Sequence, residues 1–503
     1  MATNCCIFDT TNAVNTITIE EDPKFRISLD KAVCTEAQKH VLLNLFAEFH
    51  DVFSKNAYDL GSSKTDSVHI YTNTEIPVRG RPYRVPVKYQ AELQKHINGL
   101  LLSERITESN TPWISPIVLV PKKNGSLRVC LNFRKLNEVT VPDNFPLPRI
   151  DSIIEKVGGS KYFSSLDMAN GYLQLRLDDE SSYKCGFTTE EKVYAYTHLP
   201  FGLKSAASYF QRALRTVLAG LENDVLVYID DVLVFSKTFE SHVQTLKKVL
   251  SRFRAYNLKA SPAKCEFVKK SIAFLGHEIN ECNYSPNEAN LHTIKQLPVP
   301  TDAKGVLRFL GMAGFFRKFI KKFSNIAEPL TRLNKKDVPF EWTSQQQEAF
   351  DTLKQLLASK PILTFPNYDK EFHIFTDASA VAQGAMLAQT TDDPNQFQAI
   401  AYASRTLSDT ETRYPAIQIE LGAIIFALRH FKPYVYMSKV ILHTDHRPLK
   451  YILAKQKVHE RVARWLIELQ QFDIEIKHID GKRNTVADCL SRAKDEVTPL
   501  PEE

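Results

Sequence analysis

The stretch from Val225 to Phe235 reads Val-Leu-Val-Tyr-Ile-Asp-Asp-Val-Leu-Val-Phe. Two apolar, β-branched runs flank a pair of adjacent aspartates, which predicts two buried strands joined by a turn at Asp230 and Asp231. Two carboxylates at the tip of an apolar hairpin repel each other, and burial raises that cost. A bound cation would offset the repulsion, so the stretch indicates a metal site. An ordinary hairpin turn that contains aspartates is the alternative that this stretch alone leaves open.

The overall composition is that of an ordinary globular protein. The chain has 503 residues, of which 43% are apolar and 24% are charged. At roughly 150 residues each, this length accommodates about three domains. The net charge of +6 is modest for this size and argues only weakly for a nucleic-acid partner. No apolar run approaches the ~20 residues of a membrane span, and the N-terminus lacks the plan of a signal peptide, so we expect no membrane partner.

The eight cysteines are scattered, apart from Cys5 and Cys6, and no Cys-x-x-Cys pair occurs. This pattern argues against zinc fingers and against a disulfide framework, and it favours a reducing compartment. We therefore expect an intracellular protein.

Two segments concentrate positive charge. Between Thr301 and Phe340 the sequence has nine Lys or Arg against three acids, with phenylalanines interleaved. A basic helix face of this kind suits a nucleic-acid backbone, although a solvated surface helix fits equally well. The second segment is a predicted hairpin turn that contains Lys122 and Lys123, followed by Arg128 on the next strand. These cations could bind a polyanion such as a triphosphate, or the turn could be merely solubilising.

Further carboxylates lie at the ends of predicted strands or on predicted helices. The segment from Tyr162 to Asp167 is predicted to be a strand that ends in an aspartate, and so are 372–377 and 440–445. A predicted helix over 417–431 contains Glu420, and a last helical segment contains Asp488. Strands and helices alternate throughout, which predicts an α/β or α+β chain with a mixed sheet in each part.

Several of these motifs, in this order, resemble the palm motifs of reverse transcriptases, most closely those of gypsy-type long-terminal-repeat retrotransposons. The palm-like motifs are Leu166-Asp167-Met-Ala-Asn-Gly-Tyr172, Leu199-Pro-Phe-Gly-Leu203, Tyr228-Ile-Asp-Asp231, Lys264-Cys-Glu-Phe267 and Phe274-Leu-Gly-His277. Four later motifs resemble the ribonuclease H domain of the same Pol polyproteins: Thr376-Asp377-Ala-Ser379, Glu420-Leu-Gly-Ala-Ile424, Thr444-Asp445-His-Arg-Pro-Leu449 and Val486-Ala-Asp488-Cys-Leu-Ser-Arg492.

The resemblance implies a right-hand polymerase, with fingers, palm and thumb, followed by a ribonuclease H-like α/β domain with a mixed sheet. The boundaries that we expect are an N-terminal segment over 1–65, fingers and palm over 66–240, thumb and connecting segment over 241–338, ribonuclease H over 339–495 and a tail over 496–503. The implied partners are an RNA template, a DNA primer and product, RNA–DNA hybrids, dNTPs and other retroelement Pol or Gag products. The implied location is the cytoplasm, in virus-like particles, or the nucleus.

For the polymerase site, the resemblance implies two Mg²⁺ ions, with Mn²⁺ as an alternative, roughly 3.5–4 Å apart. Asp167 and Asp230 are expected to be the principal ligands, because successive strand residues point to opposite faces and leave Asp231 a supporting role. Around them, Tyr172 would exclude a 2′-hydroxyl, and Lys264 is a candidate general acid. The expected nucleotide-binding residues are Phe201, Gly202, Arg128 and one of Lys122 or Lys123.

For the ribonuclease H site, the resemblance implies a second pair of Mg²⁺ ions. Asp377, Glu420, Asp445 and Asp488 would hold them, so that seven metal-binding carboxylates are present in the chain. His478 is expected on a loop, where it would either help product leave or be simply structural. Trp465 is expected to pack in the core.

One departure from the family pattern concerns the fingers. Where the family usually has an aspartate, this chain has Asn132, which removes a charge that could orient Arg134. The main hypothesis is an active RNA-directed DNA polymerase with ribonuclease H. The alternative is a decayed or domesticated copy that binds nucleic acid without catalysis, and a host DNA-dependent polymerase is disfavoured by the fused ribonuclease H.

Overall fold

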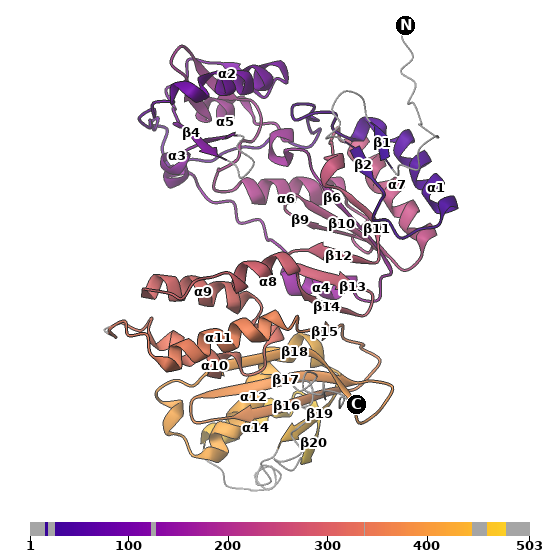
Figure 1. The fold of residues 1–503 in the computed structure, drawn as a ribbon, viewed down its shortest axis with the longest axis vertical. Coiled ribbons are helices and arrows are strands. Elements are labelled where there is room, and N and C mark those ends of the chain that lie inside the picture. The colour runs from indigo at the N-terminus through magenta and orange to yellow at the C-terminus, as the bar shows by residue number, and fades with distance from the viewer. Residues whose placement is uncertain (1–15, 19–25, 122–126, 337, 445–459, 479–503) are drawn as a thin grey trace, which may run out of the picture. The chain divides into compact units, whose positions relative to one another are not determined.

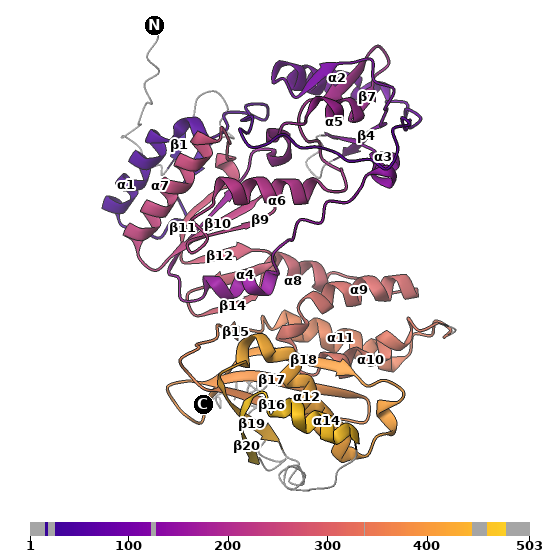
Figure 2. The same ribbon diagram turned by 180° about the vertical axis from the view of Figure 1, so that it is seen from behind.

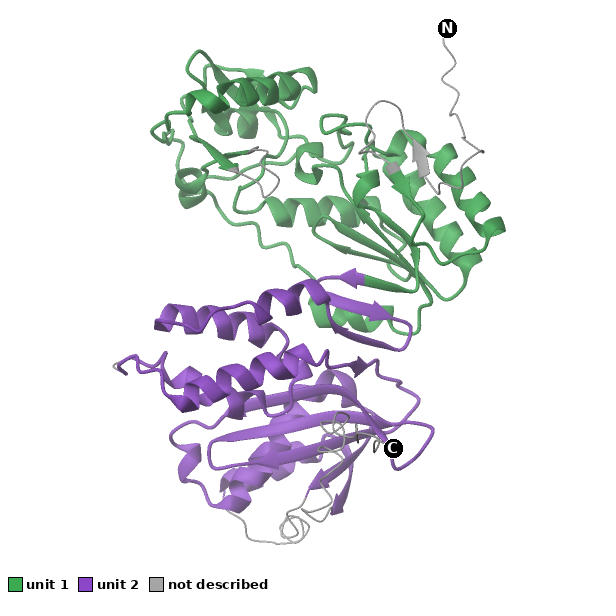
Figure 3. Ribbon diagram, viewed as in Figure 1, with its two compact units in different colours: residues 1–272 green, residues 273–503 purple. Residues whose placement is uncertain are grey.

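The computed structural model describes residues 16–18, 26–121, 127–336, 338–444 and 460–478. The chain divides into two compact units, residues 1–272 and residues 273–503 (Figure 3). Each unit is built around its own sheets. The described helices include none that is long and apolar enough to cross a membrane.

The centre of the first unit is a four-stranded antiparallel sheet in the order β11-β6-β10-β9. Its strands are β6 (Tyr162–Asp167), β9 (Val225–Tyr228), β10 (Asp231–Ser236) and β11 (Glu266–Lys269). Helix α7 (Phe239–Ala255) packs on β6 and β10, and helix α6 (Ala206–Val217) packs on β9 (Figure 1). The apolar residues of β10 from Val232 to Val234 are fully buried, which explains the continuous apolar run in the sequence.

A second group of elements in this unit lies at its other end (Figure 2). It contains a three-stranded sheet in the order β3-β8-β7 and the hairpin β4-β5. The strands are β3 (Ile106–Glu108), β4 (Ile117–Pro121), β5 (Leu127–Leu131), β7 (Gly186–Thr188) and β8 (Val193–Tyr196). The helices are α2 (Val87–Leu102), α3 (Arg134–Val139) and α5 (Asp179–Lys184). Helix α4 (Ile150–Val157) lies apart from this group (Figure 2), and its Ile153 lines a small cavity together with Gln211 of α6 and Val227 of β9.

The described part of the N-terminal segment packs into the core of the first unit. Strand β1 (Thr16–Thr18) pairs with β2 (Arg26–Ser28), and helix α1 (Glu36–Glu48) follows. The ring of Phe46 lies 4.5 Å from that of Phe267 on β11 and 5.9 Å from that of Phe53. In addition, the Ser54 backbone N–H donates to the Ala260 carbonyl at 2.9 Å. The segment, for which the sequence suggested no role, therefore supports the central sheet.

The second unit contains a five-stranded mixed sheet in the order β18-β17-β16-β19-β20. Strands β16, β17 and β18 pair antiparallel, whereas β16-β19 and β19-β20 pair parallel. Their bounds are β16 (Phe372–Ala378), β17 (Ala382–Thr390), β18 (Phe397–Thr406), β19 (Lys439–Thr444) and β20 (Asp473–His478). Helix α12 (Ala416–Val435) packs on β16 and β17, and α14 (Glu460–Leu469) packs on α12. Trp465 of α14 packs against this core, as the sequence predicts.

The basic region of the second unit is helical. It consists of α8 (Glu288–Lys295), α9 (Ala303–Phe315) and α10 (Phe323–Arg332), which are followed by α11 (Ser344–Ala358). A four-stranded sheet in the order β12-β13-β14-β15 accompanies them, with β12 (Ser271–Phe274), β13 (His277–Asn280), β14 (Asn283–Pro286) and β15 (Leu363–Thr364). Helix α10 packs on β17 and β18.

The mixed sheet expected in each part of the chain is found only in the second unit. Among the described residues of the first unit, every pairing between named strands is antiparallel. The physical reason is connectivity, because strands such as β9 and β10 are joined by short turns, which allow only antiparallel pairing.

Candidate active sites

The paired aspartates lie where the sequence places them, at a turn between two buried strands. Strand β9 ends at Tyr228 and β10 begins at Asp231, so Asp230 is in the turn and Asp231 is the first strand residue. Between the strands, Ile229 has a φ of 57°, which is unusual for a β-branched residue. The Ile229 backbone N–H donates to Oε1 of Gln211 at 2.6 Å. This buried glutamine also donates from Nε2 to the Val227 carbonyl at 3.0 Å, so it holds the turn from both sides.

Strand pairing brings a third carboxylate to the turn. In the register of β10 and β6, Asp231 lies directly opposite Asp167. Burial raises the pKa of Asp231 to about 6, and the charges of Asp230 and Asp167 add to this effect. Burial also raises the pKa of Asp167, and Asp230 adds to it. Burial and neighbouring like charges together make these carboxylates costly to ionise, and a bound cation would offset that cost.

A lysine ammonium partly offsets this repulsion. Lys264 Nζ donates to Oδ1 and Oδ2 of Asp167 at 3.0 and 3.3 Å. This contact lowers the pKa of Asp167, although burial outweighs it. Lys264, which the resemblance suggested as a general acid, therefore forms an ion pair with Asp167, a predicted metal ligand.

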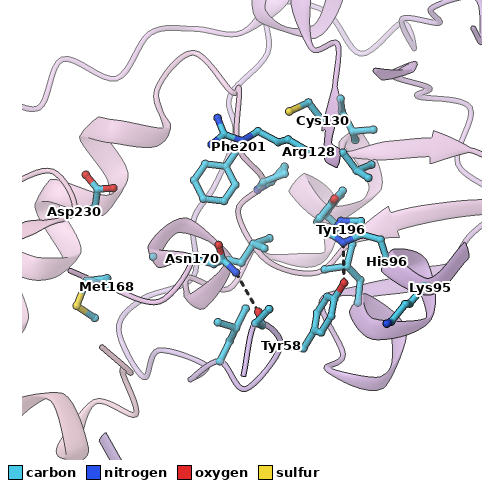
Figure 4. Close-up of a pocket in the computed structure, with 18 of the residues that line it drawn as sticks. Tyr58, Lys95, His96, Arg128, Cys130, Met168, Asn170, Tyr196, Phe201 and Asp230 are labelled. Atoms are coloured by element: carbon cyan, nitrogen blue, oxygen red, sulfur yellow. Dashed lines mark hydrogen bonds between the residues drawn. The ribbon is translucent and has the colours of Figure 1, made fainter. Parts of the chain in front are cut away.

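A cavity of about 920 Å³ opens beside the turn. Figure 4 shows Asp230 at one side of it and Arg128 and Phe201 at another. Lys264 also lines it. The cavity thus combines predicted metal-binding and nucleotide-binding residues from β5, the β9–β10 turn and the loop before α6, which are far apart in the sequence.

The aromatic residues predicted for the nucleotide pocket contact one another. The ring centroid of Tyr172 lies 5.0 Å from that of Phe201 and 5.4 Å from that of the buried Phe210. Burial raises the pKa of Tyr172 to about 12, with a smaller contribution from Asp230, so the phenol stays protonated. Gly202 has a φ of +97°, and its carbonyl accepts a 3.0 Å hydrogen bond from Nδ2 of Asn137.

In the fingers, Arg128 is an exposed residue of β5, whereas Lys122 and Lys123 lie outside the described residues. At the departure from the family pattern, Oδ1 of Asn132 accepts a 3.2 Å hydrogen bond from the Arg134 backbone N–H. An amide therefore accepts a hydrogen bond from the first residue of α3 in this chain.

The second predicted site is described in part. Asp377 is the next-to-last residue of β16, and Glu420 lies in the second turn of α12, which packs on that strand. His478 was expected on a loop, and this expectation is wrong. It is the last residue of β20, opposite Thr444 in the parallel ladder, because the ladder continues to that point. Asp445 and Asp488 lie outside the described residues.

Among the described residues, no group of three or more His, Cys, Asp or Glu side chains is already placed around a common point for a metal ion. The donor chemistry nevertheless fits a hard cation. The predicted ligands supply only carboxylate oxygens, which Mg²⁺ and Mn²⁺ accept, and burial together with the neighbouring aspartates raises the pKa of Asp231.

Three features of the first site were not anticipated from the sequence. Gln211 supports the turn through an ordinary helical position that no motif marks. Nδ2 of Asn170 donates to the Ala57 carbonyl at 3.1 Å, and the Tyr58 hydroxyl lies 2.9 Å from Nδ1 of His96, as the dashed lines in Figure 4 show. The N-terminal segment therefore lines the cavity.

Comparison with protein families agrees with this geometry. Residues 120–279 match the model described as reverse transcriptase (RNA-dependent DNA polymerase). Residues 342–442 match the RNase H-like domain found in reverse transcriptase. The chain carries the reverse transcriptase and ribonuclease H-like domains of a retroelement Pol polyprotein. Domains of these two kinds generally use divalent metal ions.

The curated relatives of these domains are retrotransposon polyproteins. The Pol polyprotein from transposon 297 of Drosophila melanogaster is 36% identical over 460 residues, which cover 90% of this chain and 43% of the relative. The Pol polyprotein from transposon 412 of the same organism is 35% identical, and the match covers 91% of this chain and 37% of the relative. The transposon Tf2-3 polyprotein of Schizosaccharomyces pombe is 35% identical, and the match covers 86% of this chain and 32% of the relative. The chain thus spans less than half the length of these relatives.

Solved structures show the same fold. The foamy viral protease-reverse transcriptase dRH in complex with double-stranded DNA superposes with a TM-score of 0.80 at 21% identity, covering 90% of this chain and 80% of that one. The foamy viral protease-reverse transcriptase in complex with dsDNA superposes with a TM-score of 0.79 at 20% identity, and the match covers 94% of this chain and 96% of that one. The fold expected from the sequence, a right-hand polymerase followed by a ribonuclease H-like domain, is confirmed.

Proposed function

We propose that the chain copies retroelement RNA into DNA, also uses DNA templates, and cleaves the RNA strand of RNA–DNA hybrids. One observation supports the polymerase activity above others. Asp167 and Asp231 face each other across two strands, and Asp230 lines the cavity that also contains Arg128 and Phe201. A carboxylate cluster beside a cationic and aromatic pocket matches what nucleotidyl transfer requires, namely positive charge at the transferred phosphate and a platform for the base.

In the polymerase site, Asp167 and Asp230 would hold two Mg²⁺ ions, with Asp231 in support and Mn²⁺ as an alternative. When bound, these ions would activate the primer 3′-hydroxyl and neutralise the charge that develops on the triphosphate. Arg128, with Lys122 or Lys123, would bind the triphosphate. Phe201 and Gly202 would position the nucleotide.

Tyr172 would exclude a 2′-hydroxyl through its ring, which packs edge-to-face with the ring of Phe210. The high pKa of this tyrosine keeps the phenol neutral, so no negative charge opposes the incoming triphosphate.

In the ribonuclease H site, Asp377, Glu420, Asp445 and Asp488 would hold a second pair of Mg²⁺ ions. His478 would help product leave from its place at the end of β20. RNA would be selected over DNA through its 2′-hydroxyl groups.

The exposed face of α9 supports contact with a nucleic-acid duplex. Lys304, Leu307, Arg308, Gly311 and Phe315 are exposed at helical spacing, so two cations and two apolar side chains share one face. A Cβ at Gly311 would meet no atom within 4 Å, so the glycine leaves open space at the centre of this face. Such a face can follow a phosphate backbone without reading its bases.

Location and further partners are part of the same proposal. Among the described residues, five cysteines are free thiols, which suits the reducing cytoplasm or nucleus: Cys34, Cys130, Cys185, Cys265 and Cys282. Virus-like particles and other Pol or Gag products are the expected setting, because the relatives are Pol polyproteins.

One assay tests the function. The chain is incubated with an RNA template, a DNA primer, dNTPs and Mg²⁺, and both primer length and template integrity are measured. Extension with template degradation is the expected result. Binding without extension would favour the decayed, nucleic-acid-binding alternative, and extension with an intact template would show that the ribonuclease H site is inactive.

A further inference from the structure

A short segment of the basic region is attached to the sheet that contains Asp377. Arg317 donates from Nη2 to the Ser404 carbonyl on β18 at 2.5 Å. The Ser324 backbone N–H donates to Oγ of Ser404 at 2.9 Å, and Ser324 is buried. Nδ2 of Asn325 donates to Oγ of Ser379 at 3.1 Å, two residues after Asp377. The start of α10 is therefore fixed beside the end of β16.

This attachment places a lysine directly on the predicted catalytic aspartate. Nζ of Lys322 lies 2.6 Å from Oδ2 of Asp377. Lys322 is the residue that precedes α10, with a φ of 55°, and its side chain makes no capping hydrogen bond. The left-handed conformation is uncommon outside glycine, and such conformations persist where the surrounding structure fixes them. The hydrogen bonds of Ser324 and Asn325 provide that constraint.

The sheet leaves room for the lysine stem. Gly384 of β17 lies opposite Asp377 in the antiparallel ladder. A Cβ at Gly384 would lie 4.0 Å from Cγ of Lys322, so a longer side chain at this position would meet the stem. Gly384 thus leaves room beside the lysine stem, enough for a methyl group at ordinary contact distance.

We propose that Lys322 belongs to the ribonuclease H site, where its ammonium pairs with Asp377 and competes with divalent metal for this carboxylate. The inference rests on the proposed function of Asp377 as a metal ligand. It adds to that site a residue from outside the segment that matches the ribonuclease H-like family, because that match begins at residue 342.

The exposure of the two side chains determines how strongly Lys322 should compete with the metal for Asp377. The side chains of Lys322 and Asp377 are 46% and 45% exposed, so their ion pair is screened by water and is of modest strength. Removing the ammonium frees the carboxylate and removes a like charge from the neighbourhood of the metal. We therefore expect the Mg²⁺ affinity of this site to rise about fivefold, which is the upper range for an exposed pair.

A site-resolved metal assay tests the proposal without measuring catalysis. Fe²⁺ replaces Mg²⁺ in the full-length chain, and ascorbate with peroxide generates hydroxyl radicals that cut the backbone near bound iron. Fragment lengths distinguish cuts near Asp377 from cuts near Asp230. Titration with Mg²⁺ then gives, for each site, the concentration that suppresses half of the cleavage.

The variants separate charge from folding. Lys322→Gln should lower the half-suppressing Mg²⁺ concentration near Asp377 about fivefold and leave the value near Asp230 unchanged. Lys322→Arg keeps the charge and should behave as wild type. Asn325→Ala loosens the segment and should shift the value in the same direction by a smaller factor. Lys335→Gln, which removes an exposed lysine from the same basic region, is the matched control and should change nothing.

The outcomes distinguish failure of the metal site at Asp377 from failure of the role of Lys322 alone. Absence of cleavage near Asp377 in the wild-type chain would overturn both the metal site and the role of Lys322. Cleavage that Lys322→Gln leaves unchanged, or that then needs more Mg²⁺ for suppression, would overturn the role of Lys322 alone. Cleavage near Asp230 in every variant confirms that the first unit is folded.

Discussion

Gln211 holds Ile229 in a left-handed backbone conformation through a 2.6 Å hydrogen bond between its Oε1 and the Ile229 N–H. A left-handed residue with a β-branched side chain costs roughly 1–2 kcal/mol. The position of Asp230, the next residue, therefore depends on a side chain from helix α6 and not on local preference.

Replacement of Gln211 by Leu should disturb this turn. The Ile229 N–H and the Val227 carbonyl would each lose a buried partner, which lowers the free energy of unfolding by about 1–3 kcal/mol. A displacement of Asp230 by about 1 Å should reduce kcat of primer extension by up to about a hundredfold. Urea denaturation and steady-state extension measure the two effects. Hybrid cleavage by the same preparation should be unchanged, and equal loss of both activities would contradict a local role.

Asp230→Asn should reduce primer extension to background, because the amide keeps the shape but loses the charge that a metal ion needs. Asp231→Asn should cause a smaller loss, since Asp231 is expected only to support the ions that Asp167 and Asp230 hold. Single-turnover extension at saturating Mg²⁺ measures both, with template degradation as the internal control. Full extension by Asp230→Asn would refute its assignment as a principal ligand.

The raised pKa of Asp231 predicts a pH dependence with a definite sign. Its pKa is about 6 in the folded chain, against an ordinary value of 3.8, because of burial and the neighbouring aspartates. Between these values the folded state binds more protons than the unfolded state, so without metal the free energy of unfolding falls as pH rises through this window. Denaturation of the wild type and of Asp231→Asn between pH 4 and 7 should show a steeper fall in the wild type, because the variant keeps only the contribution of Asp167, whose pKa is also raised.

Primer extension should increase as pH rises, whereas the free energy of unfolding without metal should decrease. Metal binding needs ionised carboxylates, so extension should fall as pH drops through about 6. More Mg²⁺ should move the midpoint to lower pH, because metal and protons compete for the same oxygens. A midpoint that is independent of Mg²⁺ would assign the titration to another group.

Tyr172→Val should raise the ratio of ribonucleotide to deoxyribonucleotide incorporation about tenfold or more, since removal of a steric block of one hydroxyl is worth at least ~1–3 kcal/mol. Tyr172→Phe is the matched control, because it keeps the ring and its contacts with Phe201 and Phe210. Its ratio should stay at the wild-type value. An unchanged ratio in Tyr172→Val would show that the ring does not act as the gate.

Arg308→Ala tests the duplex-binding face of α9. If Arg308 contacts a phosphate, binding should weaken equally for all sequences, and the slope of log affinity against log salt should fall by about one. Fluorescence anisotropy with primer–template duplexes of two sequences measures both quantities. An unchanged salt slope would favour the alternative of a solvated surface helix.

Much of the polymerase site could be read from local patterns. The apolar runs around Asp230 and Asp231 predicted β9 and β10, because burial on both faces requires continuous apolar strands. Asp167 was found by the same logic at the end of β6. The spacing of motifs then indicated the family, since the order of strands and loops is fixed along the chain.

Other features depend on contacts between residues that are distant in the sequence. Gln211, Tyr58 and His96 belong to ordinary helical or loop segments, so no local pattern distinguishes them from surface residues. The loop expected for His478 came from the resemblance, whereas in the structure this residue ends β20 and pairs with Thr444 of β19, which is distant in the sequence.

Lys264 and Lys322, which form ion pairs with predicted metal ligands, show most clearly which features follow from the sequence and which depend on how the chain folds. The sequence alone predicted Asp167 and Asp377 at or next to the ends of strands in a polymerase and a ribonuclease H-like domain, because hydrophobic periodicity and motif order are encoded locally. It could not establish that Lys264 and Lys322 would lie on those aspartates. Which cation meets which carboxylate depends on how the chain packs, since Coulomb attraction acts through space and a lysine side chain gives no sign in the sequence of its partner.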